Sequence, residues 1–206
     1  MTDRGRVGVL ASGAGTNLQA ILDHLHGREG IVVVAVASNH SDAPALERAA
    51  RAGVPQAAFE ESAYPDRAAR DVAIADWLEE RGAGQVALAG YMQLLSPRFL
   101  TRFPGAVINV HPALLPAFPG LDAIEQAIAY GVKVFGVTVH LVDEGIDSGP
   151  IILQRAVELP EARRPQDVLE RLRPIEHELL VQGVRLIARG AISLDPENPR
   201  RVVIAT

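Results

Sequence analysis

The sequence predicts an α/β fold with one mainly parallel, twisted sheet flanked by helices, and two observations indicate it. Short apolar runs rich in Val, Ile and Ala recur along the chain, and such continuous runs are typical of strands buried on both faces. Segments of helical character separate the runs, and this alternation favours a parallel sheet. Because 206 residues is close to the size of one domain, we expect a single domain, 1–206.

The expected elements follow one another along the chain. The strands are expected at 7–11, 31–37, 86–89, 106–110, 134–142 and 151–157. The helices are expected at 17–24, 44–52, 66–80, 97–102, 122–130 and 167–189. Pro174 should kink or divide the last helix, because proline lacks the backbone N–H that a helix needs. The segment 194–206, Pro-rich and then apolar, is expected to form a short edge strand or a tail.

Composition excludes several classes of function. Cysteine is absent, so a disulfide framework, a thiolate nucleophile and a cysteine-ligated metal are excluded. Lys and Arg number 20 against 25 Asp and Glu, a net charge of −5, so no nucleic-acid partner is expected. The apolar run 31–37 is far shorter than the roughly 20 residues of a membrane span. With no signal peptide visible at the start, we expect a cytoplasmic protein with no membrane partner.

A small-residue loop, residues 12–17 (Ser-Gly-Ala-Gly-Thr-Asn), follows the first strand and opens the first helix. Unpaired N–H groups and the helix dipole favour an anion there. Leu18 stands where a dinucleotide fingerprint has a third Gly or Ala, and no acidic residue closes the second strand, which counts against NAD. Without a Gly-Lys-Ser/Thr sequence, a Walker loop is excluded. A monophosphate cradle and a plain tight turn remain open.

Two polar side chains end the strand at 106–110 and are two residues apart. Asn109 and His111 therefore face the same side, and Val110 faces the other. Pro112 holds His111 in extended backbone, and the Pro-rich stretch that follows, 112–120, predicts a rigid wall beyond the strand end. Ligands of open α/β sheets sit at such ends. A binding or catalytic pair and an ordinary, satisfied histidine are both compatible with this pattern.

The loop 142–150 carries three acids within five positions, Asp143, Glu144 and Asp147. Apolar strands on both sides argue against a calcium loop. A carboxylate here could pair with His111, although the spacing alone does not show that they meet.

Three motifs resemble the phosphoribosylglycinamide formyltransferase family, and together they span most of the chain. They are 10–20 (LASGAGTNLQA), 109–116 (NVHPALLP) continuing to Pro119 and Gly120, and Thr138-Val139-His140 continuing through 143–147 (DEGID) to Gly149 and Pro150. The resemblance implies a formyltransferase fold with a Rossmann-like N-terminal half. A nucleotide-phosphate-binding half would cover about 1–105, and a folate-binding and catalytic half about 106–206.

The resemblance also implies a reaction. The amine of glycinamide ribonucleotide would attack the formyl carbon of 10-formyltetrahydrofolate, the cosubstrate, without a metal. His111 would be the general acid, Asn109 the oxyanion donor, and Asp147 the carboxylate that keeps His111 protonated. His140 is expected to be a supporting, hydrogen-bonded histidine. Ala117 departs from the family pattern, because some relatives carry a basic residue there.

Binding residues for both substrates are implied by the same motifs. Gly15, Thr16 and Asn17 would hold the phosphate, and Glu176 the sugar or glycinamide, although Glu176 alone also fits a solvated helix face. The residues implied at the folate are Arg67, Met92, Gln93, Leu94, Leu95, Asn109, Asp143, Glu144, Gly145, Ile146 and Asp147.

Four other functions fit the sequence less well, because length and charge argue against the first and the others each leave a feature unexplained. Methionyl-tRNA formyltransferase would need a further domain and a basic surface, and formyltetrahydrofolate hydrolase normally has an extra N-terminal domain. A sugar-nucleotide formyltransferase matches the phosphate loop less well. A non-catalytic nucleotide-binding module would not explain Asn109, His111 and Asp147 together. The expected oligomeric state is a monomer or a homodimer.

Overall fold

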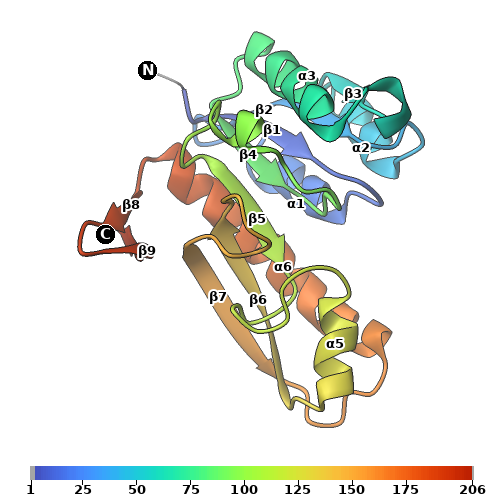
Figure 1. Ribbon diagram of the computed structural model, residues 1–206, viewed down its shortest axis with the longest axis vertical. Helices are drawn as coiled ribbons and strands as arrows, with labels where there is room; N and C mark the ends of the chain where they lie inside the picture. Colours follow the sequence, from blue (N-terminus) through green and yellow to red (C-terminus); the bar gives the residue numbers. More distant parts are fainter. Residues whose placement is uncertain (1–2, 206) are drawn as a thin grey trace.

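The computed structural model describes residues 3–205, and within that range nine strands form one sheet in the order β3-β2-β1-β4-β5-β6-β7-β9-β8 (Figure 1). The strands are β1 (Arg6–Leu10), β2 (Val32–Ser38), β3 (Gln56–Ala58), β4 (Gln85–Leu88), β5 (Val107–His111), β6 (Val134–Leu141), β7 (Ile151–Glu158), β8 (Ile192–Asp195) and β9 (Asn198–Ile204). The helices are α1 (Thr16–His24), α2 (Pro44–Arg51), the 3-10 helix η1 (Glu61–Ala63), α3 (Arg67–Glu80), α4 (Pro97–Leu100), α5 (Ala123–Tyr130) and α6 (Pro165–Ala188). Residues 1, 2 and 206 lie outside the described range. The expected α/β fold is confirmed.

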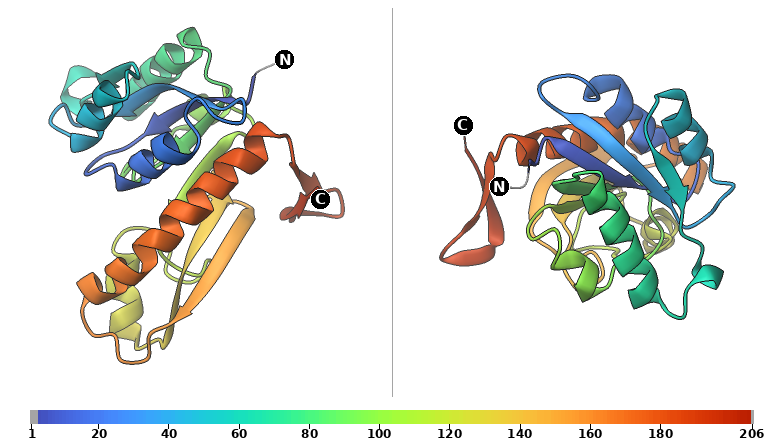
Figure 2. Two further views of the ribbon diagram at one scale, coloured as in Figure 1. Left: turned by 180° about the vertical axis from the view of Figure 1, so that it is seen from behind. Right: turned by 90° about the horizontal axis from the view of Figure 1, so that it is seen from above.

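The N-terminal half is a parallel sheet, since every pairing from β3 to β5 is parallel. Its two faces carry separate apolar cores. Leu18 and Ile21 of α1 join the core on the face that α6 also covers, and Ile74 and Leu78 of α3 join the other. Figure 2 shows α1 and α6 together on one side of the sheet. This arrangement brings the loops after β1, β4 and β5 to one edge.

The C-terminal half is mostly antiparallel, because β5 pairs with β6, and β6 with β7, in opposite directions. The expectation of strands buried on both faces is wrong for β7. Gln154, Ala156 and Glu158 on one face are exposed, whereas Leu153, Arg155 and Val157 on the other face are half-buried. The alternation arises because α6 packs on one face of β7 while the other face stays open.

Helix α6 runs without interruption through Pro174, so the expected division is wrong. Buried side chains precede and follow the proline on the face that meets the sheet, among them Leu172, Leu179 and Val184. Burying these side chains before and after Pro174 stabilises the helix and offsets the backbone hydrogen bond that proline cannot donate. In the described part of the chain, no helix combines the length and apolar character needed to cross a bilayer.

The two edges of the sheet contain strands that the sequence predicted only in part or not at all. The segment from 194 onward, expected as a short edge strand or a tail, does lie at the edge of the sheet, as part of an antiparallel hairpin of β8 and β9. Within the described residues, this hairpin pairs with β7 at Ile151 and Arg201 and projects from the body (Figure 1). The edge strand β3 was not expected, because its three residues are half-buried or exposed and form no apolar run.

Candidate active site

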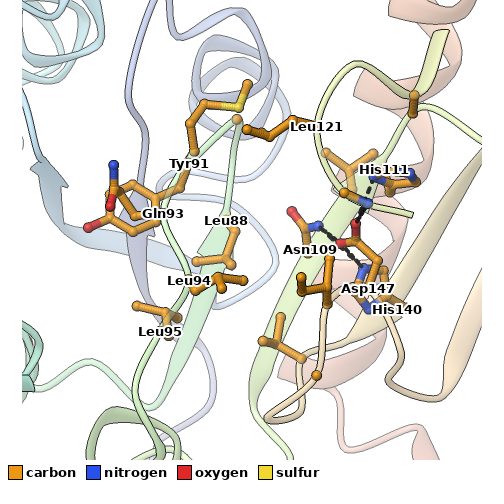
Figure 3. A pocket seen from close by; sticks show the side chains of 18 of the residues that line it. Leu88, Tyr91, Gln93, Leu94, Leu95, Asn109, His111, Leu121, His140 and Asp147 are labelled. Carbon is orange, nitrogen blue, oxygen red and sulfur yellow. Dashed lines mark hydrogen bonds and ion pairs between the residues drawn. The ribbon is translucent and has the colours of Figure 1, made fainter. Parts of the chain in front are cut away.

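The register between β5 and β6 places three polar side chains together. Asn109 and His111 lie two residues apart on β5, and Asn109 stands directly opposite His140 of β6. His111 and His140 are both buried. The loop after β6 then returns Asp147 to the same place, as Figure 3 shows.

Asp147 contacts all three of these side chains. Its Oδ2 lies 3.3 Å from His111 Nδ1, and its Oδ1 lies 3.4 Å from His140 Nε2 and accepts a hydrogen bond from Asn109 Nδ2 at 3.2 Å. The backbone N–H of Gly120 donates to Oδ2 at 2.8 Å. The pairing of His111 with an acid of the 142–150 loop, which spacing could not show, is therefore present.

Opposing effects act on the pKa of the Asp147 carboxyl. Burial raises it, whereas the hydrogen bonds from His140 and the Gly120 N–H, with the nearby charge of His111, lower it, and the net pKa lies below its ordinary value. Asp147 is therefore a carboxylate at neutral pH. It can hold positive charge on the imidazoles beside it.

The Pro-rich stretch packs as a wall beside His111. His111 Nε2 lies 2.8 Å from the carbonyl oxygen of Phe118, which can only accept, so Nε2 carries a proton. Thr138 fixes the start of the stretch, because its hydroxyl donates to the Ala113 carbonyl at 2.7 Å and accepts from the Leu115 N–H at 3.2 Å. The ring of His111 is thus held at both nitrogens.

A cavity of about 410 Å³ opens in front of these groups, within the range of small-molecule sites. All of the residues expected at the folate except Arg67 line it, namely Met92, Gln93, Leu94, Leu95, Asn109, Asp143, Glu144, Gly145, Ile146 and Asp147. Met92, Leu94 and Ile146 are 61%, 48% and 54% exposed. Arg67 is exposed at the start of α3 and does not line the cavity.

The glycine loop 12–17 opens α1 as expected. Gly15 has a left-handed φ of 69°, and a Cβ there would lie 2.8 Å from Ala45, so the backbone conformation requires glycine. Asn17 Nδ2 lies 3.5 Å from Glu176 Oε2 of α6. Burial raises the pKa of Glu176, and the contacts with Asn17 and Arg173 lower it by less. Glu176 therefore does not lie on a freely solvated face.

Sequence reasoning missed two contributors. The Gly120 N–H that binds Asp147 is a backbone group and has no residue-type signal. Ser12 joins the glycine loop to the cavity wall, because its hydroxyl donates to Asn39 Oδ1 at 2.6 Å and accepts from the Met92 N–H at 2.8 Å. The supporting role expected of His140 is consistent with its contacts to Leu141, Asn109 and Asp147.

Comparison with known proteins identifies the family. The family described as formyl transferase matches residues 5–184. Phosphoribosylglycinamide formyltransferase of Bacillus subtilis (strain 168) is 42% identical over 171 residues, which cover 82% of this chain and 88% of that protein. The chain belongs to the phosphoribosylglycinamide formyltransferase family.

Two further members show the extent of the similarity. The crystal structure of glycinamide ribonucleotide transformylase 1 from Symbiobacterium toebii has 48% sequence identity and a TM-score of 0.93, and the alignment covers 98% of this chain and 94% of that one. The trifunctional purine biosynthetic protein adenosine-3 of Bos taurus is 40% identical over 198 residues, 96% of this chain. This chain spans only 20% of that bovine protein. The resemblance, the formyltransferase fold and the class of enzyme expected from the sequence are confirmed.

The pKa of Glu176 predicts how stability depends on pH. Because the folded protein holds this proton more tightly than the unfolded chain, the ionised carboxylate costs stability once the pH rises through the raised pKa. Glu176→Gln removes the charge and keeps an acceptor for Asn17. At pH 7.5 we expect Glu176→Gln to have a higher free energy of unfolding than the wild type. This gain should vanish below pH 4.5, the ordinary pKa of a glutamate. Urea denaturation at several pH values measures both.

Glu178 provides a control of opposite sign. Its hydrogen bonds from Arg155 lower its pKa, so Glu178→Gln should lose stability at pH 7.5, and the loss should fade as the pH falls through the lowered pKa. If the stability gained by Glu176→Gln is the same at every pH, the argument that burial raises the pKa of Glu176 is contradicted.

Proposed function

We propose that this chain transfers the formyl group of 10-formyltetrahydrofolate to the amine of glycinamide ribonucleotide, giving formylglycinamide ribonucleotide and tetrahydrofolate in purine biosynthesis. The observation that carries the proposal is the Asp147 carboxylate, held between His111 and Asn109 at one side of the cavity. Attack of an amine on a formyl group places negative charge on the formyl oxygen and positive charge on the amine. Asn109, His111 and Asp147 together provide groups that can stabilise both charges.

The cavity fits a folate as the formyl donor. Apolar side chains of Met92, Leu94 and Ile146 form its exposed walls, and flat ring systems bind between such side chains. The carbonyl groups of the 143–147 loop can accept from the amino and ring N–H groups of a pterin. When bound, the folate supplies the electrophilic formyl carbon.

We assign His111 as the general acid, Asn109 as the oxyanion donor and Asp147 as the carboxylate that keeps His111 charged. With Nε2 already protonated by its contact with Phe118, a second proton on Nδ1 gives an imidazolium that faces Asp147 Oδ2 at 3.3 Å. Asn109 Nδ2 faces Asp147 rather than the cavity. Its role as donor therefore requires the amide to turn.

The proposed phosphate site is the start of α1, with Gly15, Thr16 and Asn17. Free N–H groups and the helix dipole attract the phosphate there. The 3.5 Å distance between Glu176 Oε2 and Asn17 Nδ2 supports the proposed role of Glu176 at the sugar or glycinamide. The division into a phosphate-binding half, about 1–105, and a folate-binding and catalytic half, about 106–206, stays a prediction. The cavity takes walls from both, because Met92 and His111 line it together. A monomeric or homodimeric state also stays a prediction.

A spectroscopic assay of formyl transfer tests the proposed function. We expect tetrahydrofolate to form from 10-formyltetrahydrofolate only when glycinamide ribonucleotide is present, with one formylated product for each folate consumed. Equal turnover without the amine would contradict the transferase and indicate a hydrolase.

The catalytic assignment predicts the effect of two substitutions. His111→Ala and Asp147→Asn should keep the fold and lower kcat about 10²-fold or more, because each removes part of the acid–base machinery. Circular dichroism and the same assay measure the two properties. Near-normal turnover in either variant would contradict that residue's role.

The phosphate site predicts a selective binding defect. Gly15→Val should force the loop to shift, because of the left-handed φ and the close approach to Ala45, and should weaken binding of glycinamide ribonucleotide about tenfold or more. Folate affinity should change little. Gly13→Ala is the matched control, since a Cβ there meets no neighbour within 4 Å. Equal losses for both ligands in calorimetry would contradict the assignment.

A further inference from the structure

Helix α2 packs against the glycine loop and takes up two of its carbonyl oxygens. The Ala45 N–H donates to the Gly13 oxygen at 3.1 Å, and Arg48 Nε donates to the Ala14 oxygen at 2.8 Å. A Cβ at Gly15 would lie 2.8 Å from Ala45, so glycine at this position is what lets the helix approach so closely. The loop is therefore supported from α2 by two hydrogen bonds and a close contact.

The hydrogen bond from Arg48 fixes the direction of one peptide unit of the loop. The oxygen of this unit belongs to Ala14 and its N–H to Gly15, and in a trans peptide the two groups point in opposite directions. The Gly15 N–H therefore points away from Arg48. Because glycine adopts either sign of φ at little cost, a peptide unit next to Gly15 turns over easily unless a partner holds its oxygen. Arg48 is that partner.

The guanidinium of Arg48 is itself held in place. Arg48 is half-buried, and its Nη1 donates to Gln19 Oε1 at 3.1 Å. Gln19 lies in the first turn of α1 and is fixed in turn by donating to Asp23 Oδ1 at 2.9 Å. The carboxylate next to Arg48 on α2, Glu47, pairs instead with Arg51 at 3.0 Å. One rigid guanidinium thus joins α2 to the loop and to the helix that the loop opens.

The start of α1 offers N–H donors that the helix itself does not use. The hydrogen bond that begins α1 runs from the Gln19 N–H to the Gly15 oxygen at 2.9 Å, so the N–H groups of 15–18 have no partner within the helix. A second, independent observation points to a ligand. Asn17 is 8% exposed, and among the described residues its buried Oδ1 has no hydrogen-bond partner, whereas the polar atoms of a packed core are paired. Because α2 holds both loop carbonyls, a phosphate bound here meets donors.

We propose that Arg48 is a positioning residue for the phosphate of glycinamide ribonucleotide. By binding the Ala14 oxygen, it keeps the Gly15 N–H turned toward the phosphate. The proposal rests on the phosphate site proposed at the start of α1. If the peptide unit turns over, a donor to the phosphate is replaced by a carbonyl oxygen that repels it. Arg48 lies on the carbonyl side of the unit, so it acts through the peptide and not by touching the phosphate.

Two substitutions of equal length separate the hydrogen bond of Arg48 from its charge. Arg48→Gln places an amide nitrogen where Nε stands, so this variant is neutral and still has a donor for the Ala14 oxygen. Arg48→Met is also neutral and fills the same space, but it has no donor. If Arg48 acts by position, the two variants differ in phosphate binding. If it acts only through its charge, they bind phosphate equally.

NMR with inorganic phosphate as the probe tests the proposal without the substrates. At constant ionic strength we expect phosphate to shift the backbone amide signals of Gly15 and Thr16 in the wild type. The Kd for phosphate should be about tenfold higher in Arg48→Met and within about threefold of the wild-type value in Arg48→Gln. Equal Kd values in the two variants, or a wild-type Gly15 signal that phosphate does not move, would overturn the proposal.

Kinetics supply the second measurement. Arg48→Met should raise the KM for glycinamide ribonucleotide about tenfold and leave kcat and the KM for the folate within about twofold, because only binding of the phosphate is weakened. The matched control is Arg51→Met, which removes the same charge one turn further along α2 from a side chain that is 74% exposed, and its KM should stay at the wild-type value. A loss confined to kcat, or an equal rise in KM in the control, would overturn the positioning role. Phosphate binding that depends on Arg48 in a protein that transfers no formyl group would support the positioning role and contradict the proposed function instead.

Discussion

The geometry of the site depends on one carboxylate. Asp147 joins two strands and the Pro-rich stretch, because its two oxygens meet His111, Asn109 and His140 and also accept from the Gly120 N–H. A half-buried carboxylate is stable only when such partners offset its desolvation. The partners are therefore coupled, and removing the carboxylate would leave two histidines and an amide without a common acceptor.

The change of direction within the sheet places His140 beside Asn109. The parallel strands β1, β4 and β5 bring their following loops to one edge, as in other α/β sheets. Because β6 returns antiparallel beside β5, His140 lies against Asn109, and β6 ends at Leu141 opposite Ile108, near the start of β5. The loop after β6 must therefore run back along β5 to bring Asp147 to His111.

Local patterns predicted some of this arrangement and could not predict the rest. The spacing of Asn109 and His111 fixed their common face, since alternation along a strand is a local property. Their meeting with Asp147 depends on the path of a loop, so only the family motifs indicated it. Local patterns also could not predict that α6 continues through Pro174 or that burial alternates along β7. Both depend on packing against residues that are distant in the sequence. The Gly120 contact uses a backbone group that any residue possesses.

The cavity lining explains why exposed apolar side chains stand next to a charged cluster. Met92, Leu94 and Leu121 are exposed, and Leu121 reaches 66%, which is costly unless a ligand covers them. A flat apolar ligand at these side chains would also exclude water from Asn109 and His111, and electrostatic interactions strengthen when water leaves. With a net charge of −5, the protein as a whole does not attract anionic substrates. Their binding must rely on the helix start at Gly15 and on the imidazoles that Asp147 holds.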